Sequence, residues 1–250
     1  MKAVLEHYRG NEQFVARILD LMDQSERQYR CLITPFLTPQ EQQIALKMIG
    51  KRLYVSLWGG YDQAERRRLM MAPYEFESDG EIVCLKGHYR PGDKTLAHRD
   101  VLGALMHLGI ARDQIGDILV QKADFFVFVR GELSAFVRQE LTRIRTNTIT
   151  LEEYQGAVNY ETKVQWHTTS VSSMRLDCIV AACIHGSRSK AQPLIKGNCV
   201  KVDHIPLEDC KVLCNNNCTV SIRGYGRFLV RASMRTSRKG RLMIEIGTYQ

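Results

Sequence analysis

Apolar residues recur at helical spacing near the start of the chain. Five of them lie on one face of a predicted helix: Phe14, Val15, Ile18, Leu19 and Met22. The stretch TPQEQQIALKMIG predicts a second helix, because Thr38 can cap it, Pro39 suits its first position and Glu41 completes a capping box. A short strand, a Gly-Gly turn and a charged helical turn follow. We therefore expect residues 1–80 to form a mainly helical region.

From residue 82 onward the pattern alternates between strands and helices. The stretches EIVCLKGHY, DILV, DFFVFV and ETKVQWHTT are typical of strands, whereas DKTLAHRDVLGALMHLGI and ELSAFVRQELTRI are typical of helices. In chain order they give strand, helix, strand, strand, helix, strand, which is the split βαβ arrangement of ferredoxin-like and RRM-type domains. We therefore predict an α+β domain of this kind over residues 81–170, with a linker near Ser170–Ser173.

Two short helices and several strands are predicted after that linker. One apolar stripe runs through RLDCIVAACI, and Gly186 can end this helix in the left-handed conformation. Ser187 can cap a second helix, which Gly197 closes. Polar and apolar residues then alternate as in strands, in Val200–Val202, CTVSIRG, Phe228–Met234 and Leu242–Ile246. Residues 171–250 are thus expected to pack two short helices on a small β-sheet with a C-terminal β-hairpin.

The net charge of +8 belongs entirely to the last third of the chain. Residues 171–250 hold 13 lysines and arginines against 5 acids, whereas residues 1–170 hold 22 of each. A local positive field of this kind attracts polyanions, and the attraction depends strongly on salt. A solvated basic surface is the other interpretation of the charge alone.

Composition excludes some classes of protein. The sequence has no run of 18 apolar residues, so no membrane span is expected, and its first residues lack the apolar core of a secretory signal, so a cytoplasmic location is expected. Six of the eight cysteines lie between Cys178 and Cys218, but none forms a C-x-x-C pair. Neither a metal site nor disulfides are favoured, and no cofactor is expected.

Several cations of the last third are placed where they can bind phosphate. The free N–H groups at the start of the second helix, with Arg188 and Lys190 beside them, form a suitable phosphate site. In the strand around Phe228, a period of two puts Arg227, Arg231 and Arg235 on one face. These arginines are spaced to follow a nucleic-acid backbone.

Longer motifs carry a resemblance to known proteins. The stretch SMRLDCIVAACIHGSRSKAQPLIKGNCVKVDHIPLED resembles the S-four RNA-binding domain, with its Arg-Leu-Asp, apolar helix, Ser-Arg-x-x-Ala and Gly-x-Val-x-Val-Asn pattern. Together with SIRGYGRF, LAHRDVLGALMHLGIARDQIGDILV and GGYDQAERRR, it makes the whole chain resemble the YlmH-like family. The resemblance implies a helical N-terminal part, an RRM-like middle and a C-terminal S-four domain. It also implies ribosome association, since related S-four proteins bind large subunits that carry stranded peptidyl-tRNA in ribosome-associated quality control.

The resemblance further implies which residues contact RNA. They are Arg175, Arg188, Ser189, Lys190, Lys196, Lys201, Arg223, Gly224 and Arg227, and the strand alternation adds Arg231. The sequence departs from the family pattern at two places. Pro193 falls inside the second helix, where it removes a hydrogen bond, and Asn215–Cys218 replaces a Glu-Gly-Asp turn. Asparagine tolerates the left-handed conformation, so that turn is expected to survive.

Three other motifs have an ordinary structural interpretation beside a functional one. His98-Arg99-Asp100 imitates a kinase triplet, but no Gly-rich loop precedes it, so we interpret it as a helix start. Phe125, Phe126 and Phe128 are the aromatic residues of a predicted strand, and core packing is favoured over base stacking. The run Ala64–Arg68 either contacts RNA or a protein partner, or forms a solvated helical face.

The sequence as a whole favours a protein without catalytic residues. S-four domains also occur on pseudouridine synthases and RNA methyltransferases, but neither the catalytic aspartate motif nor a cofactor loop is found. We expect a monomer that binds ribosomal RNA, with tRNA as a further partner, and no small-molecule substrate. The alternatives are a cell-division-linked scaffold, since some family members were named for their gene neighbourhood, and a subunit of an rRNA-modifying enzyme.

Overall fold

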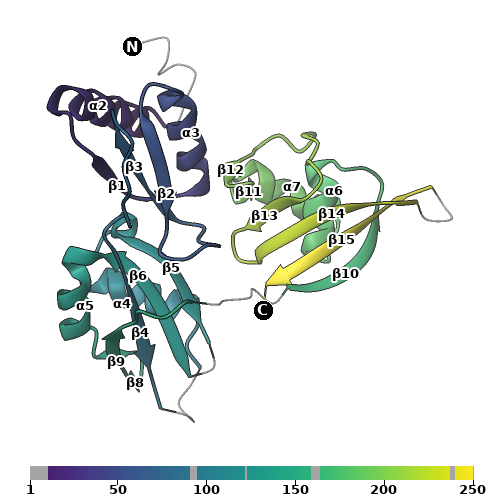
Figure 1. Cartoon of the computed structure of the whole chain (residues 1–250). Helices are drawn as coiled ribbons and strands as arrows, with labels where there is room; N and C mark the ends of the chain where they lie inside the picture. The colour runs from purple at the N-terminus through teal and green to yellow at the C-terminus, as the bar shows by residue number, and fades with distance from the viewer. Residues whose placement is uncertain (1–10, 91–94, 122, 159–163, 237–239, 250) are drawn as a thin grey trace. The chain divides into compact units, whose positions relative to one another are not determined.

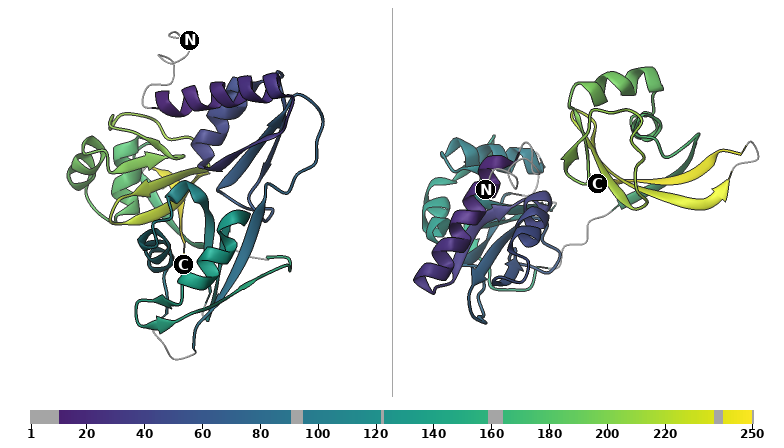
Figure 2. Two further views of the ribbon diagram at one scale, coloured as in Figure 1. Left: turned by 90° about the vertical axis from the view of Figure 1, so that its left-hand side faces the viewer. Right: turned by 90° about the horizontal axis from the view of Figure 1, so that it is seen from above.

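The computed structural model describes residues 11–90, 95–121, 123–158, 164–236 and 240–249. The chain divides into two compact units, Met1–Asn159 and Tyr160–Gln250 (Figures 1 and 2). Both units combine helices with antiparallel sheets, as the predicted α+β class requires. Within the described residues, no helix is both long enough and apolar enough to cross a bilayer.

The first unit begins with two helices packed on a three-stranded sheet (Figure 1). Its elements are α2 (Glu12–Gln28), β1 (Leu32–Leu37), α3 (Pro39–Ile49), β2 (Tyr54–Trp58) and β3 (Arg67–Ala72), with strand order β1-β3-β2. The predicted capping box at α3 is confirmed, because Glu41 N donates to Thr38 Oγ1 at 3.3 Å and Thr38 N donates to Glu41 Oε2 at 2.7 Å. The helices bury Ile18, Met22 and Ala45 against the sheet.

A mainly helical region with one short strand was predicted over residues 1–80, but three strands lie there beside the two helices in the part that the structure describes. β1 and β3 were not predicted. β1 and β3 are buried along most of their length, so they lack the alternation by which strands are recognised. The predicted helical turn at Ala64–Arg68 is instead an irregular segment up to Arg66 followed by the first two residues of β3. Its Arg68 is 2% exposed and donates to the carbonyls of Thr34, at 2.8 Å, and Gly80. The arginines of this run therefore donate hydrogen bonds to backbone carbonyls of neighbouring segments, and they do not form a solvated helical face.

A four-stranded sheet with helices on one face completes the first unit (Figure 1). Its elements are β4 (Ile82–His88), α4 (His98–His107), β5 (Ile115–Val120), β6 (Asp124–Arg130), α5 (Ser134–Glu140) and β9 (Thr150–Glu153). The antiparallel order β5-β6-β4-β9 puts the first and third strands at the centre, as the split βαβ arrangement predicts. A small hairpin of β7 (Arg143–Ile144) and β8 (Asn147–Thr148) precedes β9.

The fourth strand of this sheet is not the one that the sequence predicted. The stretch ETKVQWHTT contributes β10 (Val164–Val171), which pairs with β15 (Leu242–Tyr249) in the second unit. β9 takes its place beside β4. The boundary between the units accordingly falls at Asn159 and Tyr160, not near Ser170–Ser173.

The aromatic residues of β6 are covered, as the core interpretation requires. Phe125 and Phe128 are fully buried, and Phe126 is 7% exposed. Phe128 stacks on Tyr61, with ring centroids 4.9 Å apart, while the Phe126 ring meets Tyr154 edge-on. The sheet face that an RRM uses for stacking bases is therefore occupied here by the protein's own side chains.

Asp117 joins the two parts of the first unit. Its carboxylate accepts hydrogen bonds from Tyr61 Oη at 2.9 Å, from Glu65 N at 2.7 Å and from Arg66 N at 3.0 Å. Two of these donors are backbone N–H groups, which are strong donors whose pairing stabilises the fold. The loop after β2 is thus held against β5.

We expect Asp117→Ala to lower the free energy of unfolding of the first unit by about 2 kcal/mol, since it removes three part-buried hydrogen bonds to one carboxylate. Asp62→Ala is the matched control, because this exposed side chain lies in the same loop. Urea denaturation followed by tryptophan fluorescence measures both variants. Equal stability of the two would contradict the role given to Asp117.

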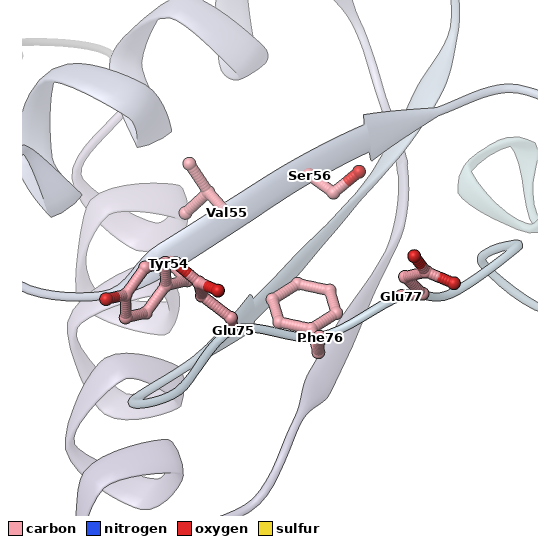
Figure 3. Close-up of a pocket in the computed structure, with 6 residues that line it drawn as sticks. All are labelled: Tyr54, Val55, Ser56, Glu75, Phe76 and Glu77. Atoms are coloured by element: carbon pink, nitrogen blue, oxygen red, sulfur yellow. The ribbon is translucent and has the colours of Figure 1, made fainter.

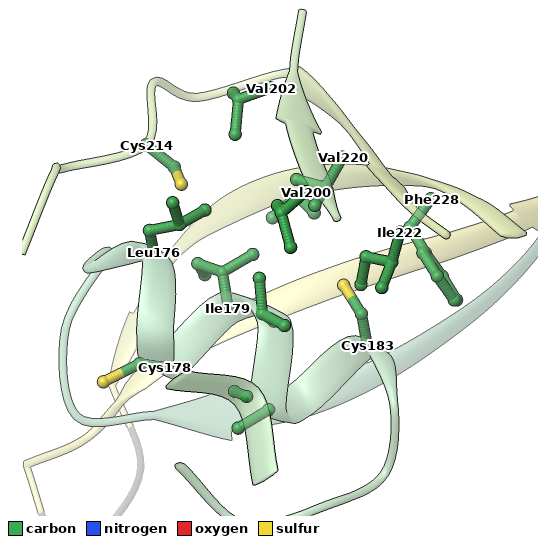
Figure 4. Close-up of a cluster of buried hydrophobic side chains, with 14 of the residues drawn as sticks. Leu176, Cys178, Ile179, Cys183, Val200, Val202, Cys214, Val220, Ile222 and Phe228 are labelled. Carbon is green, nitrogen blue, oxygen red and sulfur yellow. The ribbon is translucent and has the colours of Figure 1, made fainter. Parts of the chain in front are cut away.

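The second unit packs two short helices on a six-stranded sheet. Its elements are β10, α6 (Leu176–Cys183), α7 (Arg188–Lys196), β11 (Val200–Val202), β12 (Ile205–Pro206), β13 (Cys218–Ile222), β14 (Gly226–Thr236) and β15 (Leu242–Tyr249). The strand order is β10-β15-β14-β13-β11-β12. Figure 4 shows Leu176, Ile179 and Cys183 directed at Val200, Val220 and other strand residues. All eight cysteines are thiols, and Cys183, Cys214 and Cys218 belong to this core.

Candidate nucleic-acid interface

The two helices of the second unit end in the same way. Gly186 N donates to Ala181 O at 2.8 Å and Cys199 N donates to Leu194 O at 2.9 Å, which closes a Schellman motif in each case. The left-handed residues are His185, with φ 49°, and Asn198, with φ 53°. The left-handed conformation predicted at Gly186 therefore falls one residue earlier, at His185, whereas Gly197 is the C-cap of α7 and closes it as predicted.

Asp177 links the starts of both helices. Arg175, the N-cap of α6, donates from Nε to Asp177 Oδ1 at 3.2 Å and from Nη2 to Oδ2 at 3.0 Å. Arg188, the first residue of α7, donates from Nη2 to the same Oδ2 at 2.6 Å. The carboxylate is fully buried, whereas the arginine side chains are 33% and 51% exposed. One buried acid therefore holds two surface cations side by side.

This arrangement fixes the charge of all three groups. The hydrogen bonds from Arg175, and then from Arg188, hold the pKa of Asp177 well below its ordinary value despite burial. The same contacts raise the pKa of both guanidinium groups. The trio carries a net positive charge next to the N-terminus of α7, whose dipole adds to it, whereas the first N–H groups of α6 donate to Val212 O and Cys210 O.

The first turn of α7 presents polar groups to solvent, as predicted. Ser187 caps the helix, since its Oγ accepts from Lys190 N at 3.4 Å and lies 2.7 Å from Ser189 Oγ. Ser189 and Lys190 are exposed. Pro193 lies inside α7, which nevertheless runs through to Lys196. The proline therefore leaves the first turn of α7 unaffected.

A second group of predicted residues gathers at the other end of α7. Lys196 is exposed in the last turn, and Arg223 N donates to Cys199 O at 2.9 Å just beyond the helix. Gly224 has φ +86° in the β13–β14 turn, where an L side chain would be strained. Given the rise of 1.5 Å per residue, about 12 Å separate the two ends of α7.

The remaining predicted residues face away from the helices. Val200, Phe228 and Val230 point into the core, so Lys201, Arg227 and Arg231 lie on the opposite face of the sheet. Lys201 is opposite Ser221, which is opposite Arg227, so the two cations lie in one row across the strands.

The predicted row of arginines along β14 does not present three equivalent guanidinium groups. Arg227 Nη2 lies 3.3 Å from His204 Nε2, and the Arg231 guanidinium stacks on the Trp166 ring at 4.0 Å. The β14–β15 register shifts between Ala232 and Thr236, so the regular alternation that was expected to place Arg235 in this row is interrupted before it. The strongest candidates for phosphate contact are therefore the residues at the two ends of α7.

Comparisons with known proteins agree with the resemblance drawn from the motifs. The family description "YlmH, N-terminal" matches residues 10–76, and "Putative RNA-binding domain in YlmH" matches residues 77–157. The chain is 32% identical over 234 residues to Ribosome-associated protein quality control protein P2 of Bacillus subtilis (strain 168), with 91% of each chain covered. The chain belongs to the YlmH family.

A solved YlmH structure shares the fold. It is named cell division protein ylmH from Streptococcus pneumoniae, and it superposes with a TM-score of 0.52 at 24% identity. The match covers 59% of this chain and 92% of the other. At this identity the likeness establishes the fold alone.

In the first unit, residues from the motifs that carry the YlmH resemblance lie close together around Ile115. Arg66 Nε and Arg112 Nη1 both donate to Ile115 O, at 3.2 and 2.6 Å. Burial and the neighbouring Arg66 lower the pKa of Arg112 to about 10. His98 begins α4, as the helix-start interpretation predicted, and burial and Arg112 lower its pKa. Asp100 accepts from Ala97 N at 2.9 Å in the first turn.

The roles of two residues of the site, Asp177 and Trp166, were not predicted from the sequence. Asp177 was visible only as part of Arg-Leu-Asp, although an acid on the otherwise apolar stripe of α6 was a usable signal. Trp166 gave no signal at all, because its stretch was assigned to another sheet. Gly247, opposite Trp166 in the ladder, leaves room for its ring, since a Cβ there would lie 3.1 Å from it.

Proposed function

We propose that this YlmH-family chain is a non-catalytic RNA-binding protein that associates with the ribosome. The proposal extends to the large subunit carrying peptidyl-tRNA, in ribosome-associated quality control or translation rescue, with ribosomal RNA and tRNA as partners. Support comes from the Bacillus subtilis relative, which is named for ribosome-associated quality control, and from the family's RNA-binding domain. A ribosomal partner implies a cytoplasmic location, and we propose that the chain acts as a monomer.

One observation carries the proposal: Asp177 holds Arg175 and Arg188 together at two helix N-termini. Charged guanidinium edges, the first N–H groups of α7 and the exposed Lys190 then converge within one turn of helix. This is the set of donors that phosphate oxygens accept from. The helix pair on a small sheet is also what an S-four domain requires, and we propose that the second unit is one.

RNA shape, rather than base sequence, is the expected target. The predicted contact residues are mostly lysine and arginine on exposed surface, and they reach phosphates in any sequence. Tyr61 and Tyr154 lie against Phe128 and Phe126, so these two β6 rings are not open for stacking on single-stranded bases.

Co-sedimentation of the full chain with purified ribosomal subunits tests this function. We expect the chain to travel with large subunits at low salt and to be released at high salt or by ribonuclease. Binding to division proteins that survives both treatments would favour the division-linked scaffold instead. Methyl transfer to ribosomal RNA, or uridine isomerisation, by the pure protein would show an rRNA-modifying enzyme and contradict the non-catalytic assignment.

A further inference from the structure

A hollow runs along the open edge of the three-stranded sheet. β2 is the edge strand, because it pairs with β3 on one side only. Beside it runs the extended segment Glu75–Asp79 (Figure 3). The hollow has a volume of about 490 Å³ and is lined by Tyr54, Val55, Ser56, Glu75, Phe76 and Glu77. A second hollow of about 510 Å³ continues it past Glu77 to Trp58 and Asp79.

The backbone on both sides of this hollow is open to a further strand. Among the described residues, no ladder or loop hydrogen bond joins β2 to Glu75–Asp79. The outward N–H and C=O groups of an edge strand are a template for pairing. Natural edge strands are usually protected by lysine, proline or a bulge, yet β2 reads Tyr-Val-Ser-Leu-Trp and pairs with β3 in regular register.

The side chains around the hollow select the chemistry of an occupant. Glu75, Glu77 and Asp79 are exposed along the outer wall, and no ion pair involves them within the described chain. Tyr54, 51% exposed, and the half-buried Phe76 and Trp58 supply apolar surface. The acidic wall repels phosphate, which disfavours RNA here, whereas an extended peptide can pair with β2 and place cations beside the acids.

We propose that this edge groove, formed by β2 and Glu75–Asp79, binds an extended basic peptide by strand addition to β2. Apolar side chains of the peptide enter the hollow beside Phe76, and alternate lysines or arginines face Glu75 and Glu77. Alternation with a period of two allows both contacts at once. The groove lies in the first unit, whereas the proposed RNA contacts lie in the second. It gives the chain a protein partner with a lysine- and arginine-rich extended segment.

A short fluorescein-labelled peptide in which lysine and valine alternate tests the proposal on the full chain. We expect saturable binding by fluorescence anisotropy, and backbone amide NMR shifts concentrated in β2 and Glu75–Asp79. Glu75→Lys with Glu77→Lys should weaken binding about tenfold, since two attractions become repulsions. Asp20→Lys with Glu140→Lys, an equal charge change at exposed sites elsewhere in the first unit, should leave binding nearly unchanged.

Peptides with a modified backbone distinguish strand addition from simple ionic attraction, because only strand addition uses the backbone N–H groups of the peptide. Two further peptides are methylated on every second backbone nitrogen, one at the odd and one at the even positions, so that each keeps its charge but loses half of its backbone donors. One of the two should bind at least tenfold more weakly than the parent peptide, because only alternate N–H groups face β2. No binding of the parent peptide, equal binding of all the methylated forms, or an unchanged affinity in the Glu75 and Glu77 variant would each overturn the proposal. A uridine oligonucleotide that shifts the same β2 amides more strongly would also overturn it.

Discussion

Asp177→Ala is expected to destabilise the second unit by about 2–3 kcal/mol and to release both arginines that it holds. The substitution removes a fully buried carboxylate and its three charge-assisted hydrogen bonds, which leaves Arg175 and Arg188 like-charged neighbours. Removing one partner of a fully buried pair costs about 3–5 kcal/mol, and the cost is lower here because both guanidinium groups reach water. Urea denaturation followed by circular dichroism measures the change.

Glu208→Ala is the control for this experiment. Glu208 is an exposed acid in the same unit, and its loss should change the free energy of unfolding by less than about 0.5 kcal/mol. The two variants alter net charge equally, so a difference between them reports the buried contacts. If Asp177→Ala were as stable as Glu208→Ala, Asp177 would not hold the helices together.

The pH dependence of stability gives a second readout of the same residue. Since the pKa of Asp177 is lowered in the folded chain, its contribution is fully present above the ordinary aspartate pKa of about 4. Below that pH the unfolded carboxyl takes up a proton and the folded one does not, so the contribution falls as pH falls. The wild-type chain should therefore lose more stability than Asp177→Ala between about pH 5 and pH 2.5.

The sequence predicted elements best where one face is buried and the other is solvated. Helices α2, α3, α6 and α7 were found because each carries an apolar stripe, and α3 and α7 also begin at a capping side chain. β1 and β3 were missed because LITPFL and RRLMMA are buried on both faces, which removes the alternation. In RRLMMA, the buried Arg68 also imitates a solvated position, although its guanidinium is satisfied by carbonyls.

Sheet membership and side-chain pairing lie beyond what a linear pattern contains. β10 was recognised as a strand but given to the wrong sheet, because its partner β15 is far away in the chain: Val164 pairs with Tyr249. Arg175, Arg188 and Lys190 were found from motif and charge, yet their joint anchoring by Asp177 depends on how α6 packs against α7. Sequence therefore gave the composition of the site, and only the fold gave its geometry.

Reversing two exposed lysines should weaken RNA binding about a hundredfold at moderate salt. Lys190 and Lys196 lie at opposite ends of α7, and both side chains are exposed. Neither lysine contacts Asp177, so Lys190→Glu with Lys196→Glu tests the interface without disturbing the buried carboxylate. Each reversal removes a phosphate contact and adds a repulsion, so each should weaken binding about tenfold, and the two together about a hundredfold.

Salt dependence distinguishes lost phosphate contacts from a general loss of affinity. If both lysines bind phosphate, the slope of log affinity against log salt should become about 2 units shallower in the variant. Lys47→Glu with Lys51→Glu makes the same charge change on exposed positions of the first unit, and it should leave the slope unchanged. Anisotropy titrations of labelled ribosomal RNA fragments at several salt concentrations measure both quantities.

The outcome also decides which face of the second unit binds. Arg231 is already stacked on Trp166, and Arg227 lies against His204, so these two have less freedom to turn toward a phosphate than Lys190 has. Arg231→Ala should therefore weaken binding by less than about threefold, because stacking on Trp166 accounts for much of its role. If Arg231→Ala were as harmful as the Lys190 and Lys196 reversal, RNA would lie across the open face of the sheet, and the helix N-termini would not be the main site of contact.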